Sequence, residues 1–497
     1  MVRVPGFDKL RVGEIPERGW VADQPQRPRS AGVVENLRAA QTGHALRLVS
    51  DAAALRGCVK LCAPRAPGLR TLTLPHTTRI LRRMKIQLVL CVASVLTATL
   101  STRASDSWPE FRGPTGQGQS ALKQLPTTWS TNQNVAWRQE IPGTGWSSPV
   151  LHNGRVYLTS AVQSEGTKKQ TLQTLCLDAA LGKIVWATEV FRDDVAAVHK
   201  KNSQASPTPV LAGDRLYVHF GHQGTACLAL DGKVIWKNND LRYSPVHGNG
   251  GSPVLAGSAL VFSADGNAEP CVVALDKDTG KLLWKTKRET SAKKKFSFST
   301  PLVLEVNGKP QIISPGSGAV CAYDPQDGKE LWRVRYGEGY SVVPRPIFGH
   351  GLLFLSSGFD QPWVYAIRPD GSGDVTDTHV AWKLTKSAPH TPSLLLIEDE
   401  LYFVSDAGIA SCVDAKTGAV HWQERVGKGC SASPLFADGK IYIQDEAGLG
   451  VVLQPGKEFK VLAKNALGER TFASYAAGDG ALFIRTEKNL YRIQAMQ

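Results

Sequence analysis

Basic, amide and aromatic side chains recur in this chain shortly before a series of Pro-containing strand starts. Fixed cations and amides suit the acceptor oxygens of an anionic or carbonyl-bearing ligand, and aromatic rings offer a stacking face. If the strand starts converge, these side chains line one axial funnel that binds a small polar ligand; the alternative is a solvated rim of loops. The candidates are Trp146, Gln204, Tyr243, His247, Asn249, Lys295, Tyr340, Arg345, His390 and Arg470.

Arg345 is the most informative of these candidates, because it replaces the small residue that precedes the proline in other repeats. We therefore expect its side chain to point toward the axis and line the funnel. His247 and His390 would need a third ligand nearby to hold a metal ion, so no metal site is predicted. No pair of groups for acid–base catalysis can be picked out, and catalytic residues stay unassigned.

Six cysteines follow residue 105, and none belongs to a CxxC pair. Their neighbours are apolar and strand-like, as in Leu175-Cys176-Leu177. Buried thiols are therefore favoured over zinc ligands or a disulfide framework. The six are Cys176, Cys227, Cys271, Cys321, Cys412 and Cys430.

Seven of the twelve tryptophans form one periodic series, with spacings of 49, 50, 48, 48, 50 and 40 residues. A large ring at one position of each repeat fills the wedge between neighbouring units, whereas a catalytic tryptophan would be needed once. We therefore predict a packing role for the whole series. Its members are Trp137, Trp186, Trp236, Trp284, Trp332, Trp382 and Trp422.

A second series marks eight repeat starts, each followed by a turn and an alternating apolar strand. Turns such as Asn153-Gly154 and Asp438-Gly439 are typical of β-hairpins. The starts are Ser148-Pro149-Val150, Thr208-Pro209-Val210, Ser252-Pro253-Val254, Thr300-Pro301-Leu302, Arg345-Pro346-Ile347, Thr391-Pro392-Ser393, Ser433-Pro434-Leu435 and Ala473-Ser474-Tyr475.

Each repeat continues with a third strand that ends in Asp and a fourth strand that carries the tryptophan. Such four-stranded units bury both faces by stacking radially, so the sequence predicts an all-β, eight-bladed propeller of antiparallel blades over residues 134–497. The strand around Trp137 has no blade before it, and the last repeat stops after its third strand. We expect this N-terminal strand to close the ring, and residues 105–133 to pack on the propeller. The Asp residues, such as Asp276, should cap turns rather than bind calcium.

The repeat Ala274-Leu275-Asp276 to Trp284, its variants, and the opening Trp108-Pro109-Glu110-Phe111-Arg112-Gly113-Pro114 resemble the pyrroloquinoline-quinone (PQQ) repeat propellers. The resemblance covers about residues 106–495 and implies the fold. It does not imply the cofactor, since the family includes quinoprotein alcohol dehydrogenases and cofactor-free relatives such as the BamB-type outer-membrane assembly propellers, which are closest in size.

The dehydrogenase branch of that family is expected to carry features that this sequence lacks. There is no pair of adjacent cysteines, no Cys-x-x-Cys-His haem site and no long insertion between repeats. We therefore predict a non-catalytic scaffold, without cofactor, that binds a protein partner or a small polar ligand. The alternative is a PQQ-dependent alcohol or sugar dehydrogenase that uses calcium in a divergent pocket, and a carbohydrate-binding surface stays open as a third.

The net charge of +14 is concentrated in the first part of the chain. Residues 1–83 carry 15 basic and 6 acidic residues, whereas residues 105–497 carry 41 and 38, so nucleic-acid binding is not expected. Residues 84–104 read as a signal peptide, with an apolar run too short to span a bilayer. We interpret 1–83 as a leader or a mis-assigned start, and expect an exported, periplasmic or envelope-associated monomer.

Overall fold

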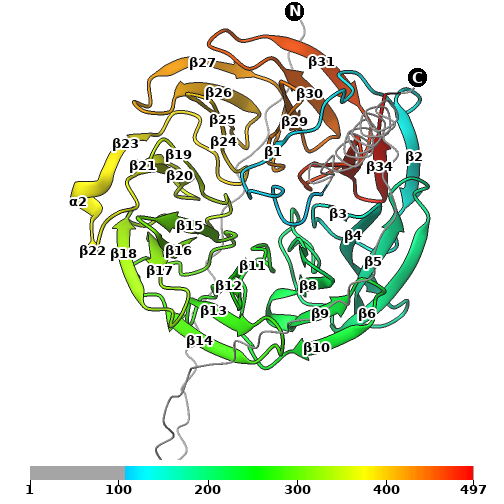
Figure 1. Cartoon of the computed structure of the whole chain (residues 1–497), viewed down its shortest axis with the longest axis horizontal. Helices are drawn as coiled ribbons and strands as arrows, with labels where there is room; N and C mark the ends of the chain where they lie inside the picture. The colour runs from blue at the N-terminus through cyan, green and yellow to red at the C-terminus, as the bar shows by residue number, and fades with distance from the viewer. Residues whose placement is uncertain (1–106, 496–497) are drawn as a thin grey trace, which may run out of the picture. The chain divides into compact units, whose positions relative to one another are not determined.

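Eight small β-sheets surround one axis in the computed structural model, which describes residues 107–495 (Figure 1). Every sheet has four antiparallel strands in sequence or circular order, and two sheets gain a fifth strand that pairs in parallel. The predicted eight-bladed propeller is confirmed. No helix within 107–495 is long and apolar enough to cross a membrane. The predicted leader and signal peptide lie outside the described residues.

Blades 1 to 4 follow one another along the chain. Blade 1 contains β3 (Val150–His152), β4 (Arg155–Gln163), β5 (Lys169–Asp178) and β6 (Ile184–Asp194). Blade 2 contains β7 (Val210–Ala212), β8 (Arg215–His219), β9 (Thr225–Ala229) and β10 (Val234–Asn238), with the short 3-10 helix η2 (Gly221–Gln223). Blade 3 contains β11 (Val254–Ala256), β12 (Ala259–Ala264), β13 (Cys271–Asp276) and β14 (Leu282–Lys287). Blade 4 contains β15 (Leu302–Val306), β16 (Lys309–Pro315), β17 (Ala319–Tyr323) and β18 (Glu330–Arg335).

Blades 5 to 8 complete the ring. Blade 5 contains β19 (Ile347–Gly349), β20 (Leu352–Ser356), β21 (Val364–Ile367) and β23 (Val380–Leu384), and its third connection holds β22 (Gly373–Asp374) and α2 (Thr376–His379). Blade 6 contains β24 (Leu395–Ile397), β25 (Glu400–Val404), β26 (Ile409–Asp414) and β27 (Val420–Arg425). Blade 7 contains β28 (Leu435–Ala437), β29 (Lys440–Gln444), β30 (Leu449–Leu453) and β31 (Val461–Ala466). Blade 8 contains β32 (Ala476–Gly478), β33 (Ala481–Arg485) and β34 (Asn489–Ile493).

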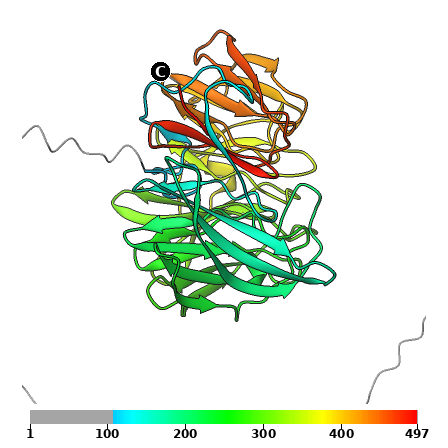
Figure 2. The ribbon, with the colours of Figure 1, turned by 90° about the vertical axis from the view of Figure 1, so that its right-hand side faces the viewer.

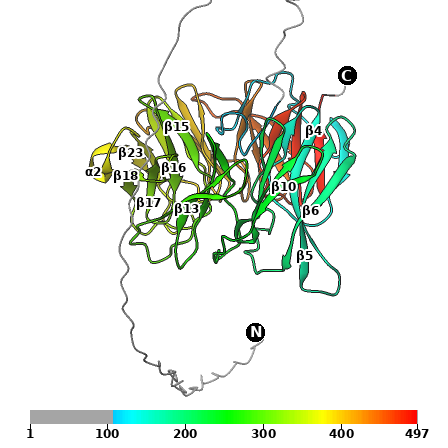
Figure 3. The same cartoon turned by 60° about the horizontal axis from the view of Figure 1, so that its bottom comes forward.

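The outer strand of blade 8 is β2 (Val135–Glu140), which comes from the other end of the described chain. It pairs antiparallel with β34, and Trp137 lies opposite Arg492. The predicted closure by an N-terminal strand is confirmed. The side views show the blades stacked around the axis, with the long hairpin of β4 and β5 extending past its neighbours (Figures 2 and 3).

The innermost two strands of each blade are joined by tight turns of the predicted kind. Asn153 and Gly154 have φ values of 49° and 69°, and Asp438 and Gly439 have 50° and 69°. Positive φ at both central residues gives the turn a twist that matches the flanking strands. The Asn-Gly and Asp-Gly pairs therefore set the register of the inner hairpins in blades 1, 4, 7 and 8.

The tryptophan series connects adjacent blades. In six of its seven members the indole N–H donates to a carbonyl in the third-to-fourth turn of the next blade, at 3.0 to 3.1 Å. The rings also lie against the glycine of that turn: a Cβ on Gly280, which has φ +72°, would lie 2.4 Å from the Trp236 ring. The predicted packing role is confirmed, and Trp332 is the exception discussed below.

Asp residues at the third-to-fourth turns bond to their own turn, as predicted. The Oδ1 of Asp276 accepts the backbone N–H groups of Asp278 and Thr279 and the hydroxyl of Thr279. Two predicted repeat starts are wrong: the residue equivalent to Ser148 is Ser393, not Thr391, in blade 6, and Ser474, not Ala473, in blade 8. The proline at 392 displaced the alignment by two residues, because the true start has Leu394 in the proline position.

All six cysteines after residue 105 are buried and free, which confirms the predicted thiols. Cys176 and Cys412 lie directly across from tryptophans of the outer strand, at Trp186 and Trp422. They fill the space between strands as small apolar groups.

His219 should contribute to the way the free energy of unfolding depends on pH, because one proton binds to it in the unfolded chain only. Burial lowers the pKa of His219 to about 3 from the ordinary value of 6.5, and its Nδ1 bonds to the Thr225 hydroxyl at 2.8 Å. Below pH 6.5 the unfolded chain binds a proton that the folded chain excludes, so stability falls as pH decreases, by about 1.4 kcal/mol per pH unit for this group. Denaturant unfolding at pH 7, 6 and 5 should show a shallower fall in His219→Gln than in the wild type. His152→Gln, near the surface, should keep the wild-type slope; equal slopes in all three proteins would contradict the assignment.

Candidate functional site

The residues that precede the innermost strands form a ring of hydroxyl groups around the axis. In this hydroxyl ring, the backbone N–H of one blade donates to the side-chain oxygen of the next, at 2.9 to 3.0 Å. Blade 5 carries Arg345 in place of a hydroxyl residue, and the hydroxyl of Ser148 in blade 1 accepts no bond from blade 8. The hydroxyl ring consists of Ser148, Thr208, Ser252, Thr300, Ser393, Ser433 and Ser474.

A cavity of about 520 Å³ lies on the axis, and all seven residues of the hydroxyl ring line it. We call this cavity the axial cup. Its lining includes no residue from the hairpin turns at the other ends of the innermost strands. The cup therefore belongs to one end of the axis, where the connections between blades lie.

An arc of rings borders the cup. Neighbouring ring centroids lie 4.5 to 6.3 Å apart along it, which is the range of favourable ring contacts. On the opposite side Trp146 meets Phe472 edge to face at 4.8 Å. The arc, named here the aromatic rim, runs through His199, His247, Phe296, Tyr340, Phe359 and His390.

Residues 108–120 run through the axis beside the innermost strands, and we call them the N-terminal plug (Figure 1). Trp108 bridges to Leu151 of β3, and β1 (Gln119–Ser120) pairs in parallel with β28. Phe111 of the plug lines the cup. The plug thus forms the inner end of the cavity.

Arg345 holds this plug, and its predicted place in the funnel lining is wrong. Only 2% of Arg345 is exposed; its guanidinium donates to Phe111 O at 2.5 Å and pairs with Glu110 at 3.3 Å. Its Nε donates to Pro301 O at 3.1 Å. Burial raises the pKa of Glu110, although Arg345 opposes the shift. The side chain does point toward the axis, but it bonds to the plug there and is not among the residues that line the cup.

Two more buried arginines lie next to the hydroxyl ring. Arg112 of the plug donates to Leu394 O and Pro434 O, one residue beyond Ser393 and Ser433. Arg485 donates to the hydroxyl and carbonyl of Ser147. Burial lowers the pKa of Arg485 to about 9, and burial together with Arg345 does the same to Arg112.

Four predicted site residues line the cup: Trp146, His247, Tyr340 and His390. Arg470 lies just behind, with its guanidinium 6.0 Å from the Trp146 ring centre and 5.2 Å from that of Phe472. Lys295 is not among the lining residues, and Gln204 is buried with its amide donating to Ala196 O at 2.6 Å. Ligand binding by any of these residues remains a prediction.

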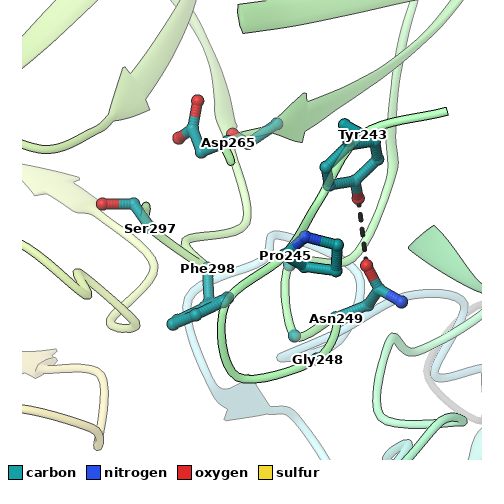
Figure 4. A pocket seen from close by; sticks show the side chains of 10 residues that line it. Tyr243, Pro245, Gly248, Asn249, Asp265, Ser297 and Phe298 are labelled. Carbon is teal, nitrogen blue, oxygen red and sulfur yellow. Dashed lines mark hydrogen bonds between the residues drawn. The ribbon is translucent and has the colours of Figure 1, made fainter. Parts of the chain in front are cut away.

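Tyr243 and Asn249 do not reach the cup either; they line a much smaller cavity of about 10 Å³ in blade 3 (Figure 4). The Tyr243 hydroxyl donates to Asn249 at 3.1 Å, and the Asn249 amide donates to Phe220 O at 3.0 Å. Asn249 is 2% exposed. Its function is therefore to join two loops, which the sequence could not distinguish from ligand binding.

Charged groups of the cup are mostly engaged with each other. Lys201 forms an ion pair of 2.6 Å with Glu446, so it joins the connection between blades 1 and 2 to blade 7. Asp406 accepts the backbone N–H groups of His390 and Thr391 and the Thr391 hydroxyl. Burial would raise the pKa of Asp406, but the bonds from His390 and Thr391 outweigh it and lower the pKa.

The donor set of the cup does not fit a calcium-bound quinone. Calcium takes six to eight oxygen ligands, usually with several carboxylates. Asp406 is the only carboxylate among the lining residues, and its two oxygens already accept hydrogen bonds. Within residues 107–495 no group of three His, Cys, Asp or Glu side chains could hold a metal ion.

The cup is also lined by four residues that the sequence pattern did not predict: His199, Lys201, Phe359 and Asp406. They lie in connections whose path the repeats do not specify. The Ser and Thr of the repeat starts were predicted only as repeat markers, although their recurrence before seven of the eight innermost strands was the available signal of the hydroxyl ring.

Comparison with known proteins agrees with this geometry. The family model described as "Outer membrane protein assembly factor BamB" matches residues 127–268, 175–424 and 363–482. The chain belongs to this family of PQQ-like repeat propellers. A crystal structure of BamB from Moraxella catarrhalis superposes with a TM-score of 0.50 at 12% identity, covering 72% of this chain and 99% of that chain. The superposition shows the shared propeller fold.

Curated relatives carry two kinds of name. A quinohemoprotein alcohol dehydrogenase ADH IIB of Pseudomonas putida is 26% identical over 65% of this chain and 49% of its own length. An outer membrane protein assembly factor BamB of Francisella salina is 28% identical over 35% of this chain and 31% of its own length. The aligned part thus spans half or less of these relatives, and membership in the family does not choose between the two names.

Proposed function

We propose that this protein is an exported, non-catalytic binding propeller, which captures a small polar ligand or a segment of a protein partner in the axial cup. The observation that carries the proposal is the cup itself, with a hydroxyl from seven blades and an aromatic rim. Cavities of this size with few convergent polar groups are typical ligand sites. Relatives named as outer-membrane assembly factors support an envelope location and a protein partner.

The same geometry argues against quinone-dependent oxidation. Alcohol oxidation needs a base placed to take the hydroxyl proton. The cup offers Asp406 and three histidines, but Asp406 already accepts hydrogen bonds from the backbone of His390 and from the backbone and hydroxyl of Thr391, in the segment before β24. We therefore expect no turnover when the purified protein is given PQQ, calcium and ethanol in a dye-linked assay; calcium- and PQQ-dependent dye reduction would overturn the proposal.

The binding face can be tested in the cells that make the protein. A photoreactive phenylalanine analogue placed at Tyr340 lies on the aromatic rim, whereas the same analogue at Leu283 lies on the exposed outer strand of blade 3. Irradiation should give a discrete adduct from the first position and none from the second. Labelling from neither position, or equal labelling from both, would contradict the cup as the binding site.

A further inference from the structure

The hydrogen bonds of the hydroxyl ring all run in the same direction around the axis. At six of its positions the side-chain oxygen accepts a backbone N–H from the preceding blade. None of these hydroxyls donates a hydrogen bond to another group within residues 107–495. Because each of these oxygens already accepts a bond, its hydroxyl proton is still free to donate a hydrogen bond to a ligand.

Ser148 makes this point most clearly. Ser148 is one of the residues that line the cup, and its hydroxyl oxygen is buried with no hydrogen-bond partner among the described residues. A buried polar group without a partner is costly, and native structures rarely leave one unless another molecule satisfies it. The unpartnered oxygen therefore points to an occupant of the cup that bonds to it.

The charge beside the ring has the sign that an anion needs. Arg112, Arg345 and Arg485 are each bonded to a carbonyl within one residue of a ring position. Glu110 is the one carboxylate that forms an ion pair with any of them; neither Arg112 nor Arg485 has an acidic partner in the described chain. Even when Asp406 of the cup lining is counted with Glu110, three buried guanidinium groups against two carboxylates leave a positive potential at the inner end of the cup.

We infer that the axial cup binds the carboxylate head of an otherwise apolar molecule. The head bonds to the hydroxyl ring, where O–H donors and the arginine potential favour an anion. The apolar body packs between the aromatic rim and the pair formed by Trp146 and Phe472. This inference rests on the proposed binding function and replaces its small polar ligand by an amphipathic acid that is polar only at its head.

The test uses two probes of equal shape and different charge, 2-naphthoate and 2-naphthamide, titrated into the purified protein by calorimetry. Naphthoate should bind roughly tenfold more tightly, because charge-assisted hydrogen bonds are about twice as strong as neutral ones. A short peptide with a free C-terminus, compared with its amidated form, then tells whether the carboxylate can be that of a chain end. Equal or weaker binding of both acids relative to their amides, or no binding of any probe, overturns the inference.

Ser148→Ala removes the hydroxyl without breaking an internal hydrogen bond, so it should fold normally and weaken naphthoate about three- to tenfold. Naphthamide affinity should change less. The matched control is Ser299→Ala, whose buried hydroxyl donates to Pro344 O at 2.8 Å and does not line the cup. Unchanged naphthoate affinity in Ser148→Ala would refute the ring as the binding group. A rim adduct from Tyr340 would still support the proposed function in that case, so the two failures are distinguishable.

Discussion

Arg345→Ala should lower the free energy of unfolding by about 3–5 kcal/mol, as expected when one partner of a buried ion pair is removed. The guanidinium bonds to Glu110, Phe111 and Pro301, and its loss leaves Glu110 without its ion-pair partner. The plug would also lose its bonds to Arg345 of blade 5, leaving the bond from Phe348 N to Gln117. Urea unfolding followed by tryptophan fluorescence measures the change in midpoint and slope.

Arg335→Ala is the matched control for this prediction. Arg335 forms an ion pair of 2.7 Å with Asp374, but its side chain is 44% exposed. Exposed pairs contribute about 0–1 kcal/mol, so the control should unfold near the wild-type midpoint. If Arg345→Ala also unfolded near the wild-type midpoint, Arg345 would not anchor the plug. The prediction from the sequence, that Arg345 lines the ligand funnel, would then be favoured again.

The case of Arg345 shows how far the sequence could lead. The repeat starts identify the position as exceptional and place it at the axis, and both statements hold. What receives the side chain is Glu110 and Phe111, which lie more than 230 positions earlier in the chain. No local sequence pattern predicts a contact between residues so far apart. Arg345 was therefore interpreted as a ligand-binding residue, although its role is structural.

Periodic features were predictable for a different reason. Turn residues such as Asn153-Gly154 and the tryptophans act through contacts that recur in every blade, so one repeat supports the interpretation of the next. Cup residues come from connections that differ between blades, such as the loops that carry His199 and Phe359. Their side chains meet only when the ring has closed, which explains why six of the ten predicted site residues lie elsewhere.

Trp332→Ala should have the second large effect, a loss of about 3–5 kcal/mol in the free energy of unfolding. Its side chain is fully buried, whereas Trp236, Trp284 and Trp422 retain 8 to 9% exposure. The reason is the connection in blade 5, where β22 replaces the usual glycine turn and pairs with β18, so that Trp332 lies opposite Gly373. The indole N–H therefore donates to Gln311 of its own blade, at 2.8 Å, and not to the next blade.

Two comparisons separate the packing of Trp332 from its hydrogen bond. Trp332→Phe keeps most of the ring but leaves the Gln311 oxygen unpaired, so it should lose about 1–3 kcal/mol. Trp146→Ala removes a half-buried ring from the wall of the cup and should cost less than Trp332→Ala, because little packing closes over it. Equal losses of unfolding free energy in Trp332→Ala and Trp146→Ala would mean that the pairing of β22 with β18 does not stabilise the packing of Trp332. A large loss confined to Trp332→Ala would show that an added edge strand can replace the interblade hydrogen bond that the other six tryptophans make.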